Sequence, residues 1–169
     1  MKILAKFFSL TCFITVMSVC SVTQAHVLDG AIEWNGHYYK VFQMQMTWYD
    51  ADKFCKSMGG HLVTAETQEE NEILKRILWK SESNRYKQYW YGGFFNDNSG
   101  WMWVTGVSIN YSDWINGANF DKSSPLWNPE VAISVWCGDN PQWYTSARFV
   151  KYCPFCEWES ASAAHESNM

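Results

Sequence analysis

The sequence predicts a single α+β domain, because two helix-like segments come early and a series of short aromatic strands follows them. A chain of 169 residues is long enough for one domain with a proper core and short for two. Aromatic residues make up 18% of it, and aromatic side chains favour strands over helical bundles. Hydrophobic residues reach 47% against 18% charged residues, a balance that excludes a disordered chain.

Residues 1–25 have the organisation of a secretory signal peptide. Lys2 and Lys6 form a positive segment, residues 7–19 are mostly apolar, and Ala25 offers a small residue at the cleavage point. The apolar run is too short to span about 30 Å of hydrocarbon, which argues against a membrane anchor. The residues before Cys20 fit a lipid-attachment site poorly, and no other stretch predicts a membrane span.

The expected organisation is a signal peptide over 1–25, a folded domain over 26–158 and a flexible C-terminal tail over 159–169. This organisation places the protein outside the cell, or in the periplasm or on the cell surface if the source is bacterial. A net charge of −4 makes a nucleic-acid partner improbable on electrostatic grounds.

Two helices are expected between residues 47 and 81. Thr47 is a plausible N-cap, and Gly59-Gly60 ends the first helix after one apolar face that includes Trp48 and Cys55. Thr67 begins the second helix, where Glu70 completes a T-x-x-E capping box. The buried stripe of this helix consists of Ile73, Leu74, Ile77 and Leu78.

Alternating or aromatic runs predict the strands, and turn residues separate them. The segments are 35–43, 61–63, 89–95, 101–104, 131–137, 143–150 and 155–158. Residues 108–128 have no clear period and are rich in Asn, Ser, Asp and Gly. Loops of this length in a compact domain are often functional.

Four cysteines remain after the expected cleavage: Cys55, Cys137, Cys153 and Cys156. An even number in an exported domain predicts two disulfides, but counting alone allows three pairings. Cys153 and Cys156 have C-x-x-C spacing without a second such pair or a nearby pair of histidines. This context favours structural bridges over a metal or redox site.

The sequence lacks a catalytic constellation. His26 and His165 lie near the mature ends, His37 and His61 lie in framework segments, and no Ser, Cys or Asp stands in a recognisable triad motif. We therefore expect a binding protein rather than an enzyme, with no catalytic residue, no metal ligand and no cofactor.

Several short motifs follow one another along the chain. They are Gly36-His37-Tyr38-Tyr39, Thr47-Trp48-x-x-Ala51-x-x-Phe54-Cys55, Gly59-Gly60-His61-Leu62-Val63, Tyr89-Trp90-Tyr91-Gly92-Gly93, Trp101-x-Trp103-x-x-Gly106, Tyr111-x-x-Trp114 and Cys156-Glu157. In this order they resemble the C-type lectin-like domain family, over about residues 34–158. The resemblance implies a C-type lectin-like fold, with two helices packed on short antiparallel sheets and a long binding loop.

The resemblance also implies a disulfide pattern. The family pairs its first cysteine with its last and its two middle cysteines with each other, which implies Cys55–Cys156 and Cys137–Cys153 bridges. The chain departs from the family pattern at the third cysteine. That cysteine usually lies about eight residues before the last, where this chain has Arg148.

Sugar-binding members of the family hold a Ca²⁺ through an E-P-N or Q-P-D triplet and a later W-N-D motif. Ala118-Asn119-Phe120 stands at the triplet's place, and Trp143 is followed by Tyr144 and Thr145. Both halves of the usual Ca²⁺ site are therefore missing by motif, and no Ca²⁺ cofactor is expected from it. A differently built Ca²⁺ site among the loop's oxygen donors is the alternative.

The long loop is the predicted binding surface, because it offers oxygen donors and aromatic rings that could contact a sugar or a protein. The candidate ligand-binding residues are Asn116, Asn119, Phe120, Asp121, Trp127, Asn128 and Glu130. The expected function is a secreted module that binds a carbohydrate or a surface protein. The alternatives are a protein-binding adhesion or toxin-like factor with no glycan activity, and a lectin with an unconventional Ca²⁺ site.

Overall fold

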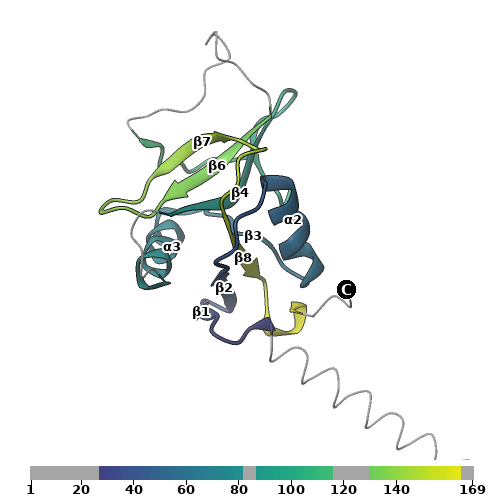
Figure 1. Ribbon diagram of the computed structural model, residues 1–169, viewed down its shortest axis with the longest axis vertical. Coiled ribbons are helices and arrows are strands. Elements are labelled where there is room, and N and C mark those ends of the chain that lie inside the picture. The colour runs from purple at the N-terminus through teal and green to yellow at the C-terminus, as the bar shows by residue number, and fades with distance from the viewer. Residues whose placement is uncertain (1–26, 82–86, 116–129, 165–169) are drawn as a thin grey trace, which may run out of the picture.

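The computed structural model describes residues 27–81, 87–115 and 130–164, and the predicted signal peptide lies outside them. The fold is α+β, as predicted, with two helices packed against a mixed sheet (Figure 1). The elements are β1 (Ile32–Trp34), β2 (His37–Val41), α2 (Trp48–Ser57), β3 (His61–Leu62), α3 (Gln68–Ser81), β4 (Gln88–Asn96), β5 (Gly100–Trp103), β6 (Val131–Trp136), β7 (Trp143–Ala147), β8 (Cys153–Trp158) and the 3₁₀ helix η2 (Ala161–Ala163).

Both helices begin where the capping residues predict. The Thr47 Oγ1 atom accepts a hydrogen bond from the Asp50 backbone N–H at 3.2 Å, and α2 follows. The Thr67 Oγ1 atom accepts one from the Glu70 backbone N–H at 3.2 Å, directly before α3. Gly59, with a φ of +78°, adopts the left-handed conformation just after α2 that glycine tolerates best.

The sheet has the strand order β1-β2-β8-β4-β6-β7, while β3 pairs with β8 and β5 with β4. Its strand pairs are antiparallel except for β4 and β8, which run parallel. The predicted antiparallel pairing therefore holds for the other strand pairs, and the β4–β8 pair adds a parallel connection to it. The last strand of the chain returns to lie between β2 and β4, so a long crossover connects the parallel pair in place of a hairpin.

The side chains of β8 alternate between two hydrophobic cores. Phe155 packs in the core that contains the buried stripe of α3. Cys156 and Trp158 pack in the core that contains Trp48, Ala51 and the other buried residues of α2. Figure 1 accordingly shows α2 and α3 on opposite sides of β8. The strand is buried on both sides along its whole length.

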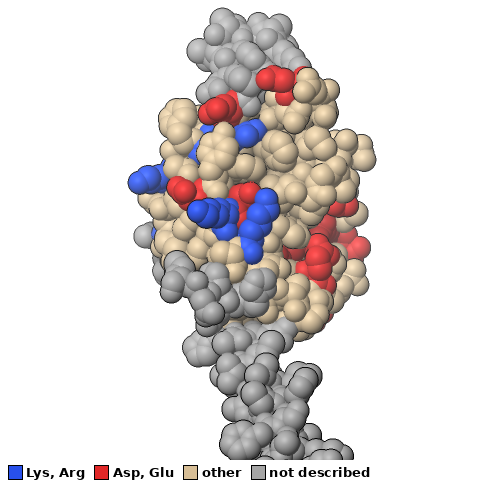
Figure 2. All heavy atoms as spheres, turned by 90° about the vertical axis from the view of Figure 1, so that its right-hand side faces the viewer, with Lys and Arg blue, Asp and Glu red and all other residues tan. Residues whose placement is uncertain are grey.

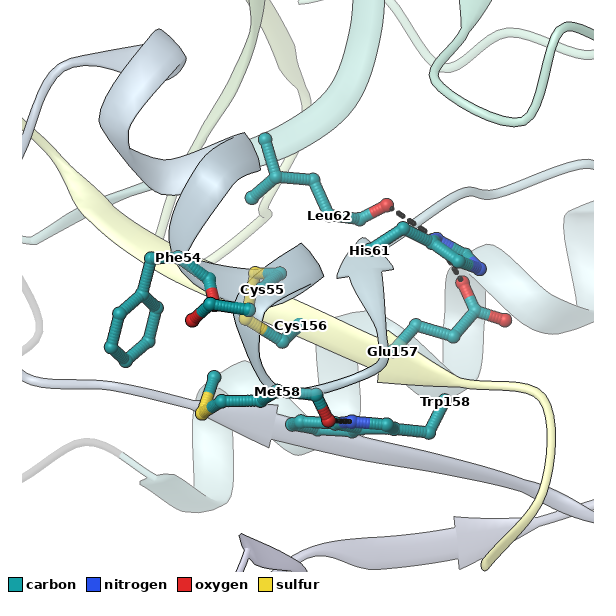
Figure 3. Close-up of a disulfide and its surroundings, with 9 residues drawn as sticks. Phe54, Cys55, Met58, His61, Leu62, Cys156, Glu157 and Trp158 are labelled. Atoms are coloured by element: carbon teal, nitrogen blue, oxygen red, sulfur yellow. Dashed lines mark hydrogen bonds and ion pairs between the residues drawn. A yellow bond between two sulfur atoms is a disulfide. The ribbon is translucent and has the colours of Figure 1, made fainter. Parts of the chain in front are cut away.

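A disulfide joins Cys55 of α2 to Cys156 of β8, 101 residues apart in the sequence (Figure 3). Beside it, the Trp158 indole N–H donates a hydrogen bond to the Met58 carbonyl at 2.9 Å. Cys137 and Cys153 are both buried in the core on the α3 side. Cys153 begins β8 and Cys137 directly follows β6, and β4 lies between these two strands. A bridge between Cys137 and Cys153 stays a prediction.

Arg148 occupies the position where the family's third cysteine usually lies, and it connects several elements. Its Nη2 donates a hydrogen bond to the Phe95 carbonyl at 2.7 Å, and its Nε donates to the Val131 carbonyl at 3.1 Å. Its guanidinium also lies 5.1 Å from the ring centroids of both Trp48 and Phe94. Arg148 therefore links the end of β7 to β4, β6 and α2 through one planar cation.

Part of the segment expected as a flexible tail over 159–169 is described, and it packs on the domain. Residues Ala161–Ala163 form η2, and Ala164 is buried in the core beside α2. Small alanine side chains allow this segment to pack closely on the domain. Residues 165–169 lie outside the part of the chain that the structure describes.

Replacing both Cys55 and Cys156 by serine is expected to lower the free energy of unfolding by about 3–5 kcal/mol, because the bridge closes a loop of about 100 residues. Urea denaturation followed by tryptophan fluorescence measures this loss. A decrease below about 1 kcal/mol would show that the bridge adds little to the stability of the paired α2 and β8.

Replacing Arg148 by methionine is expected to lower the free energy of unfolding by about 2–4 kcal/mol, because two backbone carbonyls lose a charged donor. Arg76→Met is the matched control, since the Arg76 Nε bonds within its own helix α3, to the Glu72 carbonyl at 3.3 Å. Equal stability of the two variants in urea would contradict the role given to Arg148.

Candidate ligand-binding groove

The long loop predicted to bind the ligand lies mostly outside the described residues. Asn116, Asn119, Phe120, Asp121, Trp127 and Asn128 all fall in the segment that the structure does not describe. Glu130 is described and exposed, directly before β6, and its carbonyl accepts a hydrogen bond from the Arg148 backbone N–H at 3.0 Å. The assignment of these seven residues to a binding site therefore stays a prediction.

The base of the loop is held by packed aromatic rings. Trp114 lies 5.6 Å from Trp143 and 4.8 Å from Trp101, measured between ring centroids. The Trp143 indole N–H donates to the Asn71 Oδ1 at 3.0 Å, and the Asn71 amide donates to an Asp113 oxygen at 2.8 Å. Trp143 is fully buried, so it supports the loop from the core and offers no surface to a ligand.

Charge also fixes this base. The Lys75 ammonium pairs with the Asp113 carboxylate. Although burial acts to lower it, the pKa of Lys75 is raised, because the hydrogen bond and the charge of Asp113 favour the ammonium. Lys75 and Asn71 thus both bind the Asp113 carboxylate, which fits a structural role for Asp113 at the base of the loop.

The strand half of the family's usual Ca²⁺ site does not fit a cation here. Tyr144 and Thr145 follow Trp143 on β7, and neither carries the carboxylate or amide oxygen that Ca²⁺ prefers. The Thr145 hydroxyl is buried, with no hydrogen-bond partner among the described residues. The Tyr144 side chain instead lines a groove.

This groove, of about 430 Å³, lies where β4 and β7 begin, where β6 ends and just ahead of β8. Its lining includes Lys87, Gln88, Trp136, Tyr144, Lys151 and Tyr152. We call it the aromatic–basic groove.

Strand register explains why these residues meet. Gln88 pairs with Trp136 across β4 and β6, while Tyr144 pairs with Ser134, two residues before Trp136 on the same face. The parallel pairing of Tyr89 with Cys153 then sets the residues before β8 beside the start of β4. The groove therefore depends on the parallel β4–β8 pair.

Tyr152, in the lining of the aromatic–basic groove, packs against a buried ring. The Trp90 ring is fully buried and lies 4.7 Å from the Tyr152 ring, measured between centroids. Its indole N–H donates to the Met46 carbonyl at 2.9 Å. At the surface, Trp136 keeps 37% of its area exposed. An exposed aromatic ring in such a groove can stack on an apolar sugar face.

The groove is electropositive. Among the described residues, the charged side chains that line it are Lys87 and Lys151, and Gln45 and Gln88 add amide groups. Lys87 also donates a hydrogen bond to the Gln43 side-chain oxygen, which orients it. On the face that carries α2, basic and acidic side chains lie next to one another near the centre, and uncharged side chains cover most of the rest (Figure 2). Aromatic rings, amides and ammonium groups together suit a polar ligand with negative charge.

A second cavity, of about 330 Å³, is acidic and involves the other end of β8, with His37, Glu70, Glu157 and Glu159 in its wall. Although burial acts to lower it, the pKa of His37 is raised, because Glu157 hydrogen-bonds to it and Glu159 adds negative charge. Burial raises the pKa of the Glu70 carboxyl. This cavity is therefore suited to positive charge, unlike the aromatic–basic groove.

Most of the aromatic–basic groove could not be predicted from the sequence. The pattern of β6 does carry a signal, because Val131, Ile133 and Val135 alternate with a series that ends in Trp136. An aromatic residue at the outward end of such a series indicates a surface ring. The lysines gave no signal, since they come from segments far apart in the sequence.

Comparison with known proteins agrees with the fold. Residues 44–157 match the family described as the lectin C-type domain. The chain is 31% identical over 121 residues to a chain of the snaclec salmorin from Gloydius brevicauda, covering 63% of this chain and 75% of that protein. It is 33% identical over 112 residues to snaclec 2 of Sistrurus catenatus edwardsii, covering 64% and 73% of the two chains.

Solved structures are similar too. Human lithostathine superposes with a TM-score of 0.64 at 25% identity, covering 77% of this chain and 88% of that one. The carbohydrate-recognition domain of the mouse scavenger receptor C-type lectin superposes with a TM-score of 0.63 at 22% identity, covering 77% and 95%. At 22% identity, the likeness to the scavenger receptor domain shows a shared fold and nothing more.

Proposed function

The chain belongs to the C-type lectin domain family, and we propose that it is an extracellular module that binds an acidic glycan without the usual Ca²⁺ site. Membership of the family agrees with the expectation of a binding protein rather than an enzyme. The observation that carries the proposal is the exposed Trp136 ring, which lines the same groove as Lys87 and Lys151.

The lining of the groove supports a glycan. Sugar rings present apolar C–H faces that stack on aromatic rings, and hydroxyl groups that bond to amides such as those of Gln45 and Gln88. Two lysines line the groove, and no carboxylate is among its described lining residues, which favours a ligand that carries sulfate or carboxylate groups.

Independence from Ca²⁺ follows from the same residues. Tyr144 and Thr145 replace the oxygen donors expected on β7, and the lysines of the groove would repel a divalent cation. The glycan would then be held by direct contacts with side chains, and binding would weaken with salt instead of with a chelator.

An extracellular location is supported by the predicted signal peptide over 1–25 and by the Cys55–Cys156 disulfide, since such bridges persist in oxidising compartments. Among the described residues, no helix combines the length and apolar character needed to cross a membrane.

A protein ligand is the second candidate, and a different surface favours it. Phe149 is 67% exposed and Tyr49 is 46% exposed, and both adjoin Arg148, whose guanidinium lies 5.7 Å from the Tyr49 ring. Exposed aromatic side chains beside an arginine are typical of protein interfaces. This surface is separate from the lining of the aromatic–basic groove.

We expect a heparin-derived sulfated oligosaccharide to bind the mature protein equally well in EDTA and in millimolar Ca²⁺. Trp136→Ala should weaken this binding about tenfold or more, because a stacked ring is a typical anchor. Lys151→Gln should weaken it severalfold and reduce its dependence on salt. Isothermal titration calorimetry measures each affinity.

Trp79→Ala and Lys53→Gln are the matched controls, because both side chains are exposed and lie on the helices, away from the groove. Loss of binding in EDTA, or equal losses in the controls, would overturn the proposal. A protein that binds no sulfated or sialylated glycan, but whose binding to a cell surface falls on Phe149→Ser, would support the protein ligand instead.

A further inference from the structure

A compact group of imidazoles and carboxylates lies at the end of β8 that is far from the aromatic–basic groove. His37 begins β2, His61 begins β3, Glu157 lies in β8, and Glu159 follows that strand. Glu157 pairs in register with Tyr39 on one side and with His61 on the other. The strand pairing therefore brings together four side chains that span 122 residues of sequence, and we call them the His–Glu cluster.

Three ligand atoms of the His–Glu cluster are close enough to share one ion. The His37 Nδ1 atom lies 2.8 Å from the Glu157 Oε1 and 3.5 Å from the Glu159 Oε2, and all three atoms lie within 4.8 Å of one another. Ligand atoms around a tetrahedral Zn²⁺, at bonds of about 2.0 Å, lie about 3.3 Å apart. The observed separations bracket this value, so small side-chain movements would suffice to admit an ion.

His61 is oriented as a histidine beside a metal commonly is. Its Nδ1 lies 2.9 Å from the Leu62 carbonyl, which can only accept, so this nitrogen carries the proton (Figure 3). The Nε2 atom of the same ring lies 3.0 Å from the Glu159 Oε1, so the imidazole is in direct contact with the cluster's most exposed carboxylate.

Glu157 is held as a preorganised carboxylate. It is only 1% exposed, and its Oε2 accepts hydrogen bonds from the Thr64 backbone N–H at 3.0 Å and the Thr64 hydroxyl at 3.2 Å. Its Oε1 faces His37. Among the described residues, the ion-pair partners of Glu157 are His37 and His61, with no lysine or arginine. A buried carboxylate with such partners is stabilised by a bound cation.

The adjacent cavity concentrates negative charge. Glu66, Glu70, Glu157 and Glu159 line it, and within the described part of the chain no lysine or arginine does. Glu70 adds negative charge to the cavity but is not a proposed ligand, since its two oxygens already accept hydrogen bonds from the Tyr39 hydroxyl and the Glu66 backbone N–H. A low-dielectric wall of one charge sign raises the local concentration of cations.

We propose that His37, Glu157 and Glu159 bind a divalent transition-metal ion of the Zn²⁺ class, beside the imidazole of His61. An imidazole with two carboxylates suits Zn²⁺, whereas Ca²⁺ and Mg²⁺ favour sites built from oxygen alone. The bound ion ties β2 to the end of β8. The site is independent of the proposed glycan groove, and its metal takes no part in sugar contacts there.

The test uses the mature protein, purified without a polyhistidine tag and stripped with EDTA. Isothermal titration calorimetry with ZnCl₂ should show one site per chain, and thermal melts should show a Tm raised by several degrees at a hundredfold excess over Kd. CaCl₂ and MgCl₂ should produce neither effect at the same concentration. Co²⁺ should give a visible absorption band from a nitrogen–oxygen ligand set.

His37→Gln and Glu159→Gln should each weaken Zn²⁺ binding at least tenfold and remove the Co²⁺ band. Both side chains are partly exposed, so these variants should fold. Glu69→Gln, at an exposed carboxylate in the first turn of α3, is the matched control and should bind as the wild type does. Absent Zn²⁺ binding, unchanged binding in both variants, or equal binding of Ca²⁺ would overturn the proposal. The glycan assay in EDTA is unaffected by any of these results.

Discussion

The pairing of β8 with three other strands is the interaction on which the rest of the structure depends. This last strand hydrogen-bonds to β2, β3 and β4, so it joins the N-terminal segments to the sheet that carries the groove. Its side chains reach both cores, and Cys156 locks it covalently to α2. A strand buried on both faces and bridged across 101 residues holds the two helices at fixed positions.

Both proposed sites take their geometry from β8 but lie at its opposite ends. Lys151 and Tyr152, just before the strand, enter the aromatic–basic groove because β8 runs parallel to β4. Glu157 and Glu159, at the far end, meet histidines from β2 and β3. The lining of the aromatic–basic groove carries lysines and aromatic rings, whereas the lining of the cavity beside the His–Glu cluster is acidic. A ligand of either charge therefore has a distinct place on the same small domain.

Local signals predicted the helices and most strands, but they could not predict the sites. Thr47 and Thr67 mark the helix starts because a capping bond forms within three residues. His37 and Glu157 lie 120 positions apart, and only the strand register brings them together, so the sequence did not reveal this contact. The family resemblance predicted the Cys55–Cys156 bridge correctly, but no motif indicated that Arg148 would bond across β4 and β6.

Native-state hydrogen exchange followed by NMR tests the central place of β8 most directly. If β8 holds the domain together, its amides should exchange only through global unfolding, with protection equal to the full free energy of unfolding. The β6–β7 hairpin, which lies at the sheet edge, should open with a smaller free energy. Exchange of β8 ahead of β6 and β7 would contradict the account, because the groove and the His–Glu cluster would then rest on a strand that opens first.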